Sequence, residues 1–475
     1  EETMKVKNHS AAHLIKACGI AGLLSLTSGS ALASSFALIE QSVSGMGTAY
    51  AIGSAGIGDA STVYFNPAGM SRLPGTNLSG GLQILYSQVD VDASAIYNPD
   101  NPDLGGPPPG GLAGIPISGK KKSDIDLLAG VPSGYISHQY SERLWFGFGV
   151  NAPFGLETEY DDDWVGRYHA IKSELLTYNF NPSLAFKLSD RASIGLGVSA
   201  MYADGELTNA VDGGLAAASL GIPLDPSWRP VPGVSPGLIG TSVWDNKVKM
   251  TADDWGFGFN TGLLLEPTDK TRIGLHYRSK IDLKLEGDAK VTGAVTQLNG
   301  KQDAKLDITL PDSVSLSAVH ALNPHWNIMA DVTWTHWSEV ETLDIKLADG
   351  SQSVAVWDYD DSMRYAIGAE YQRNQAWTLR TGLALDKSPV PSSSLRSPRV
   401  PDEERIWLSF GATYRYSPEL TFDVGYAHLF VDDPKLNGVP DNHDPSEAPT
   451  GAHNLSGDYD AAVDILGVQV NWKFR

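Results

Sequence analysis

The chain has 475 residues with a formal net charge of −21, and 19% of its residues are charged. This acidic balance argues against nucleic acid as a partner, because a polyanion needs a basic surface. After residue 33, no apolar run approaches the roughly 18 residues that a membrane-spanning helix requires.

The first 33 residues have the features of a secretory signal peptide. After the expected initiator Met4, basic residues lead into an apolar stretch at residues 17–26, and a small-residue cleavage site follows at residues 30–33. The only cysteine, Cys18, lies at the start of the apolar stretch rather than after it, which argues against a lipoprotein. We expect a mature chain that begins at Ser34, contains no cysteine and therefore has neither disulfides nor thiolate metal sites.

The C-terminal segment alternates strictly between apolar and polar or small residues. Its apolar positions are Leu466, Val468, Val470, Trp472 and Phe474. Such alternation predicts a strand with one apolar and one polar face. The two aromatic residues near the end are typical of the interfacial girdle of a transmembrane barrel, although a strand of a soluble sandwich also alternates.

Six short polar turns recur along the chain, each between two alternating strands. The turns lie at residues 141–143, 189–191, 268–270, 323–325, 373–375 and 417–419. Long polar or Gly/Pro-rich connections separate them, at residues 90–126, 153–172, 208–252, 286–305, 345–358, 387–403 and 433–458. Six short turns between seven long loops require 14 strands, and this segregation of loops by length is the mark of an outer-membrane barrel. We predict an all-β fold, a 14-stranded antiparallel transmembrane β-barrel over residues 76–475.

The alternation also predicts which side chains face the lumen. A charge that faces lipid costs about 2–4 kcal/mol near the bilayer midplane, so the charged set of each strand must point inward. Within residues 272–285 we therefore expect Ile281 and Leu283 to face lipid, and Asp282 and Lys284 to face the lumen. Several strands exceed the roughly 9–11 residues that span a bilayer, so we expect them to continue into the extracellular space.

Residues 34–75 precede the first strand and are rich in small residues. They contain apolar side chains such as Tyr50, Phe65 and Met70, which a disordered tail would lack, but they are too few to form a domain with its own core. We expect this segment to be a hatch, or plug, inside the barrel rather than a periplasmic tail.

Three stretches resemble the FadL family of outer-membrane long-chain fatty acid transporters. They are residues 34–51, residues 59–70 with Asn66-Pro67-Ala68 at the family's hatch motif, and residues 153–168, which resemble its third extracellular loop. One departure is Arg475, since the family commonly ends on an aromatic residue.

The resemblance implies a channel that takes up hydrophobic molecules without energy coupling. Substrate would be caught in an apolar groove among the extracellular loops, pass to a pocket in the lumen and leave sideways through the barrel wall. An apolar path with a lateral exit makes physical sense, because exposing an acyl tail to water costs about 0.8 kcal/mol per methylene.

Four residues are expected to form the outer apolar groove, with a loop that packs on itself as the alternative. They are Phe154, Leu156, Tyr160 and Trp164. In the third strand, Gly147 and Gly149 permit a bend beside the lateral exit, or they make room for the hatch.

A carboxylate head group inside the barrel needs a cation. The preferred candidates among the basic residues assigned to the lumen are Arg278, Lys280, Arg364 and Arg380. The run Asp161-Asp162-Asp163 is either a site for divalent cations or cation-bridged lipopolysaccharide, or a solvated loop face.

No catalytic constellation, nucleotide-binding loop or metal-ligand pattern stands out, so we expect neither an enzyme nor a cofactor. The alternatives are a channel for aromatic or alkane hydrocarbons, a general porin and a lipase-like barrel enzyme. We expect a monomer in the Gram-negative outer membrane, with lipid, lipopolysaccharide and the barrel assembly machinery as its other partners.

Overall fold

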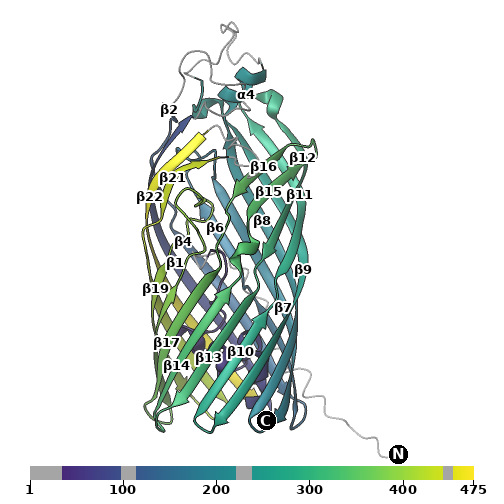
Figure 1. The fold of residues 1–475 in the computed structure, drawn as a ribbon, viewed down its shortest axis with the longest axis vertical. Coiled ribbons are helices and arrows are strands. Elements are labelled where there is room, and N and C mark those ends of the chain that lie inside the picture. The colour runs from purple at the N-terminus through teal and green to yellow at the C-terminus, as the bar shows by residue number, and fades with distance from the viewer. Residues whose placement is uncertain (1–34, 98–113, 221–237, 442–452, 475) are drawn as a thin grey trace, which may run out of the picture.

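The computed structural model describes residues 35–97, 114–220, 238–441 and 453–474 (Figure 1). The expected signal peptide, residues 1–33, lies outside the described residues. Long antiparallel strands form a tall closed wall, and helical segments lie inside its lower end and at its upper rim. None of the helices within these four ranges is long and apolar enough to cross a membrane.

The wall has 14 antiparallel strand lines, as the sequence predicts, and the last line pairs with the first, with Thr76 opposite Phe474. The lines are β1 (Thr76–Tyr97), β4 (Leu127–Gln139), β5 (Leu144–Asn151) with β6 (Gly155–Glu159), β7 (Lys172–Ser189), β8 (Ala192–Val211), β9 (Asn246–Thr268), β10 (Thr271–Arg278) with β11 (Ile281–Gly293), β12 (Gly300–Leu310) with β13 (Ser313–Ala321), β14 (Trp326–Thr335) with β15 (Thr342–Leu347), β16 (Gln352–Val356) with β17 (Ser362–Gln372), β18 (Trp377–Asp386), β19 (Arg405–Arg415), β20 (Leu420–Val431) with β21 (Lys435–Pro440), and β22 (His453–Phe474).

The remaining elements lie outside the 14 strand lines. Two short strands pair with the upper part of β1, and the helices lie in the lumen or in the loops. They are β2 (Ile115–Pro116), β3 (Lys122–Asp124), α2 (Val43–Met46), η1 (Gly53–Ala55), α3 (Thr62–Phe65), η2 (Pro67–Arg72), α4 (Gly213–Leu220), η4 (Ser242–Trp244), η5 (Thr296–Leu298) and η6 (Trp337–Glu339).

All six predicted short turns join neighbouring strands at the lower rim in Figure 1. Just above this rim the outward positions are apolar, as with the exposed Leu466 and Val468 of β22. Higher on the same strand Asp460 faces outward, so the apolar belt covers only the lower part of the wall. The strands reach 23 residues in β9 and therefore rise well beyond the bilayer. Several of the predicted long loops are therefore shorter than expected, because their ends belong to strands, as at residues 286–305.

The predicted orientation of residues 281–285 is wrong. Ile281, Leu283 and Leu285 are 3%, 1% and 2% exposed and point into the lumen, whereas Asp282 and Lys284 face outward. The alternation changes phase where β10 ends and β11 begins, because Arg278 and Ser279 are both buried. This part of the wall stands above the membrane belt, so its outer face meets water and its inner face is the apolar one.

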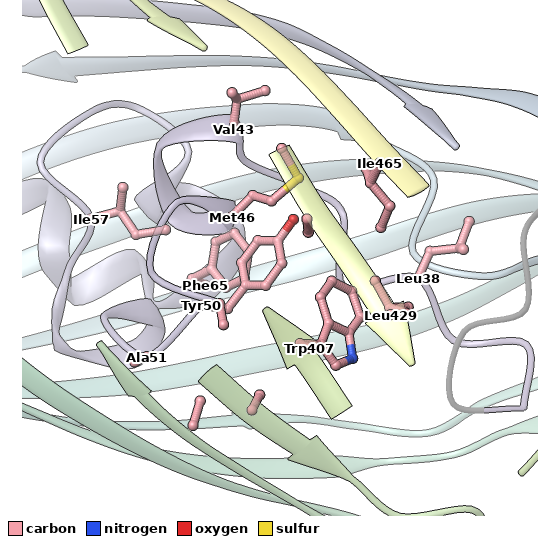
Figure 2. Close-up of a cluster of buried hydrophobic side chains, with 14 of the residues drawn as sticks. Leu38, Val43, Met46, Tyr50, Ala51, Ile57, Phe65, Trp407, Leu429 and Ile465 are labelled. Atoms are coloured by element: carbon pink, nitrogen blue, oxygen red, sulfur yellow. The ribbon is translucent and has the colours of Figure 1, made fainter. Parts of the chain in front are cut away.

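Residues 35–75 lie inside the lower barrel and bury most of their side chains. Figure 2 shows how Met46, Tyr50 and Phe65 of this hatch meet Trp407 and Ile465 of the wall. Tyr50 stacks on Phe65 with ring centroids 5.7 Å apart, and its hydroxyl donates to Gln83 Oε1 of β1 at 2.9 Å.

Glycines of the wall make room for the hatch. A Cβ atom on Gly382 would overlap the Thr48 backbone, one on Gly274 the Ser54 carbonyl, and one on Gly425 would come within 2.7 Å of Met46. The hatch and the wall are therefore complementary surfaces, and side chains at these positions would displace one from the other.

We expect Gly382→Val to displace the hatch and leave the barrel folded, because valine suits a strand but its side chain needs space that Thr48 occupies. In liposome-swelling assays the variant should admit small hydrophilic solutes. The matched control is Gly134→Val, since a Cβ atom at Gly134 has no heavy atom within 4 Å. Equal, low leakage from both variants would contradict the tight fit.

Candidate functional site: three cavities along the lumen

A cavity of about 140 Å³ lies between the hatch and the wall, and we name it the lower cavity. Hatch residues such as Tyr50 and Tyr64 line it from one side. Ser315, Asp331 and Thr333 line it from the wall, and the Asp331 carboxylate accepts from the Ser315 hydroxyl at 2.7 Å. The lower cavity thus combines aromatic and aliphatic side chains with a group of polar ones.

Two of the four predicted head-group residues line the lower cavity, Arg278 and Arg364. The Arg278 guanidinium lies 4.2 Å from the centre of the Tyr64 ring and donates to the Tyr64 carbonyl at 2.9 Å. The Arg364 guanidinium donates to the Ala49 carbonyl at 2.8 Å and lies 5.3 Å from the Trp407 ring.

Neither arginine forms a salt bridge with a described residue. Nε and Nη1 of Arg364 are buried and have no hydrogen-bond partner within the described ranges. A guanidinium carries five N–H donors and stays charged, so these groups offer a site for an anion.

The other two predicted head-group residues lie elsewhere. Lys280 is exposed on the outer surface and pairs with Glu339 at 2.8 Å, because the strand changes phase just before it. Arg380 points inward, as expected, but it is held by Glu370 at 2.9 Å and by Asp423 at 3.3 Å. Its charge is therefore already neutralised by the wall.

An almost wholly apolar cavity of about 50 Å³, the middle cavity, is lined by residues from β6 to β9, β11 and β12. Leu156, Met250 and Leu285 are among its lining residues. Because the inverted phase of β11 turns Leu285 inward, the same phase change that removes Lys280 from the lumen supplies this apolar wall.

Three aromatic side chains separate the middle and lower cavities. Phe36 lines the middle cavity, while Phe154 and Trp337 line the lower one. The Phe36 ring packs edge-on against Trp337 with centroids 4.8 Å apart and lies 6.2 Å from Phe154. The N-terminal end of the hatch therefore forms part of the partition.

The third and largest cavity, the outer cavity, has a volume of about 420 Å³ and lies among the extracellular segments. Leu343, Trp357 and Arg399 line both the outer and the middle cavity, so the two adjoin. Its lining comes from strand ends and loops that are far apart in the chain, and no sequence pattern marks these residues.

The four predicted groove residues divide into two pairs. Phe154 and Leu156 line cavities, whereas Tyr160 and Trp164 line none of the three. Tyr160 stacks on Trp164 with centroids 4.0 Å apart and donates to the Pro398 carbonyl at 2.7 Å. This pair makes the loop pack on itself.

The line of the third strand is interrupted at residues 152–154, between β5 and β6. Gly147 and Gly149 keep their ladder pairs, and the hatch residues Met70 and Val63 occupy the space beside Gly147. The break thus lies beyond the two glycines, and the close contact with the hatch explains Gly147.

Pairing of β4 with the third line stops at Gly134, and β6 pairs only with β7 among the described strands. Beside this gap the third line pairs with the hatch instead: Leu38 N–H donates to the Pro153 carbonyl at 2.8 Å, and Gly155 N–H donates to the Phe36 carbonyl at 2.9 Å.

The hatch motif is fixed by one amide side chain. Asn66 Nδ2 donates to the Ser54 carbonyl at 2.6 Å and to the Leu263 carbonyl of β9 at 3.1 Å, and Asn66 Oδ1 accepts from Ala68 N–H at 3.0 Å. Pro67 begins η2 next to this cap, where its missing N–H costs nothing. The motif therefore joins two parts of the hatch to the wall.

The run of aspartates at residues 161–163 pairs with lysines. Asp161 and Asp163 lie 3.1 and 3.2 Å from Lys120, and Asp162 lies 2.6 Å from Lys247. No set of three His, Cys, Asp or Glu side chains in the described parts of the chain is arranged to hold a metal ion.

A buried ionic cluster closes one side of the outer cavity. His453 lies at the extracellular end of β22, above the apolar belt, with Nε2 3.1 Å from Asp212 and Nδ1 2.7 Å from Asp441. Burial alone would lower the pKa of His453, but the two carboxylates outweigh it and raise the pKa to about 9. Burial lowers the pKa of the neighbouring His169 to about 4, so His169 stays neutral and adds no charge to the cluster.

A closed barrel with a hatch in its lumen and cavities along that lumen defines a transport protein of the outer membrane rather than a soluble β-sandwich. The family model described as "Outer membrane protein transport protein (OMPP1/FadL/TodX)" matches residues 24–474, and the chain belongs to this family.

Relatives agree with this assignment, and solved structures share the fold. Outer membrane protein P1 of Haemophilus influenzae is 31% identical over 439 residues, which cover 86% of this chain and 89% of the relative. The long-chain fatty acid transport protein of Salmonella typhi is 29% identical over 439 residues, 89% of this chain and 93% of the relative. A solved Pseudomonas aeruginosa FadL homologue, 24% identical, has a TM-score of 0.78 and covers 93% of this chain and 100% of its own. The solved Pseudomonas putida toluene transporter TodX is 16% identical and has a TM-score of 0.63. The match covers 90% of this chain and 98% of TodX.

We expect the His453 cluster to hold the extracellular segments together most strongly at neutral and acidic pH. A histidine with a raised folded-state pKa contributes stability below its unfolded pKa of about 6.5, and this contribution is lost as the pH rises through the folded value of about 9. Hydrogen exchange around Asp212 and Asp441 should be slower in the wild type than in His453→Gln at pH about 6.5. The difference should vanish near pH 10, about a unit above the folded pKa. A difference that is the same at both pH values would contradict the ionic role.

Proposed function

We propose that this chain mediates passive uptake of long-chain fatty acids across the outer membrane. The acid enters the outer cavity, passes the middle cavity and reaches the lower cavity with its carboxylate at Arg364 and Arg278. One observation carries the proposal: two buried arginines that form no salt bridge with a described residue line the cavity below the apolar middle cavity.

The rival substrates are aromatic and alkane hydrocarbons. The relative from Salmonella typhi bears the name of a long-chain fatty acid transport protein, whereas a solved structure of similar fold is that of a toluene transporter. A neutral hydrocarbon has no use for a buried cation, and keeping a charge away from water is costly unless something pairs with it. The arginines of the lower cavity therefore favour an acid.

We propose that release is lateral, beside the interrupted third strand. Above Gly134, β4 has no partner strand on this side among the described residues, and the neighbouring residues 153–155 of the third line bond to hatch residues 36–38 instead. A small shift of this hatch segment would therefore open a path to lipid without breaking a pair of wall strands. The hatch motif, held by Asn66, anchors the remainder of the hatch during such a shift. A lipase-like enzyme is less well supported, because the family is one of transport proteins. The monomeric state and the contacts with lipopolysaccharide and the assembly machinery stay predictions.

Removing the charge of Arg364 should weaken binding of oleate to the purified protein by about tenfold to hundredfold, since a hydrogen bond to a charged group contributes about 1.5–3 kcal/mol. Arg364→Met keeps the apolar length of the side chain, and binding of toluene should not change. The control is Lys280→Met, which removes a charge from the outer surface. Equal oleate affinity in the wild type and Arg364→Met would refute the head-group site, and a wild type that binds toluene but not oleate would favour the hydrocarbon channel.

A bulky side chain at the break in the third strand should block release without affecting capture. We expect Ala152→Trp to reduce oleate uptake by cells severalfold, while oleate binding by the purified protein stays near the wild-type value. Ala412→Trp, on the lipid-facing side of β19, adds the same side chain to an intact part of the wall and should transport normally. Normal uptake by Ala152→Trp would argue for an exit elsewhere, such as the periplasmic mouth.

A further inference from the structure

Arg399 stands out among the basic residues above the membrane belt. It lies in the connection between β18 and β19 and is only 7% exposed. Nη1 donates to Ser173 Oγ at 2.9 Å and to the Lys172 carbonyl at 3.4 Å, and Nη2 reaches Asn209 Oδ1 at 3.5 Å. All of these acceptors are neutral.

The other buried arginines of this region each have a carboxylate partner. Arg167 pairs with Asp245 at 2.6 Å, Arg396 with Glu403, and Arg405 with Asp402. Arg399 forms no salt bridge with any residue in the described ranges, although it too is buried. A buried guanidinium is costly unless its charge is compensated, so the absence of an acid here needs an explanation.

The position of Arg399 between two cavities explains why no acid pairs with it. It is one of three residues that line both the outer and the middle cavity, the others being Leu343 and Trp357. Any molecule that moves from the outer cavity into the apolar middle cavity therefore passes a cation flanked by an aliphatic and an aromatic side chain.

The charge of Arg399 is retained at physiological pH. Burial lowers the pKa of the guanidinium to about 10, which still leaves it protonated at neutral pH. The Arg399 carbonyl accepts from Thr158 Oγ1 at 3.2 Å, which ties this segment to β6. The guanidinium is thus a fixed positive charge.

We propose that Arg399 is a specificity-determining residue that binds the anionic head group of an amphipathic substrate at the junction of the outer and middle cavities. The inference rests on the proposed function and adds to it. The carboxylate is held first at Arg399 and later at Arg364, so an acid is selected at the entrance and again in the lumen. A neutral molecule of the same chain length passes Arg399 without the attraction between carboxylate and guanidinium.

The test compares oleate with oleyl alcohol, which has the same chain and a neutral head. Initial uptake rates at low substrate concentration are measured for the wild type, Arg399→Met and Arg399→Lys, after heat-modifiability shows that each barrel is folded. We expect Arg399→Met to slow oleate uptake about tenfold and to leave oleyl alcohol unchanged, because only the acid loses a charged contact. Arg399→Lys should retain most of the preference for the acid.

Binding of oleate and of oleyl alcohol is also measured in the Arg364→Met variant, where the contribution of Arg399 is separated from that of Arg364. Any preference for oleate over oleyl alcohol that remains there should disappear when Arg399→Met is added. Equal slowing of acid and alcohol by both Arg399 variants would mean that Arg399 only supports the loop, and the inference would be wrong. A wild type that transports neither compound would instead overturn the proposed function.

Discussion

A membrane-spanning sheet has to pair all its backbone groups within itself, because hydrocarbon offers no hydrogen-bond partner. The closed ladder of this barrel, with β22 paired to β1 along 22 residues, satisfies that demand. The demand also explains why the one break in the third line matters. Where the third line no longer pairs with β4, its residues 153 and 155 bond to the backbone of hatch residues 36–38 from inside the lumen. The hatch is therefore part of the wall as well as a plug.

The polarity of the inner and outer faces of the closed wall must differ between the membrane belt and the part above it. Within the belt, lipid dictates apolar residues outside and polar ones inside. Above the belt water surrounds the barrel, and the phase change between β10 and β11 turns Ile281, Leu283 and Leu285 inward. This inversion gives the extracellular half an apolar interior, where the middle cavity lies. The apolar middle cavity thus exists because the strands extend above the membrane belt.

Charge is distributed along this path in a way that fits an amphipathic cargo. Most basic side chains have acidic partners, as Arg380 has in Glu370 and Asp423. Arg399 at the entrance of the middle cavity, and Arg364 and Arg278 in the lower cavity, are the buried arginines that form no salt bridge with a described residue. Cationic side chains above and below an apolar cavity suit the carboxylate and the acyl chain of the proposed fatty acid substrate.

The sequence by itself determined the architecture of this protein. Period-two alternation and the segregation of short turns from long loops specify the strand number and the rim at which each turn lies, because both are local properties of the chain. The small-residue segment at residues 34–75 and the Asn66-Pro67-Ala68 motif likewise pointed to a hatch. Lumen orientation was predictable for Arg278, Arg364 and Arg380, since lipid forbids the alternative within the belt.

Only the tertiary structure decided where the sites lie. The phase change beyond Arg278, which put Lys280 outside, is invisible to an alternation argument that assumes lipid along the whole strand. The stacking of Tyr160 on Trp164, the break beyond Gly149 and the position of Arg399 between two cavities each depend on segments that are distant in the chain. Whether a buried cation has an acidic partner is likewise a property of the closed barrel, because the partners come from strands that meet only when the wall is complete.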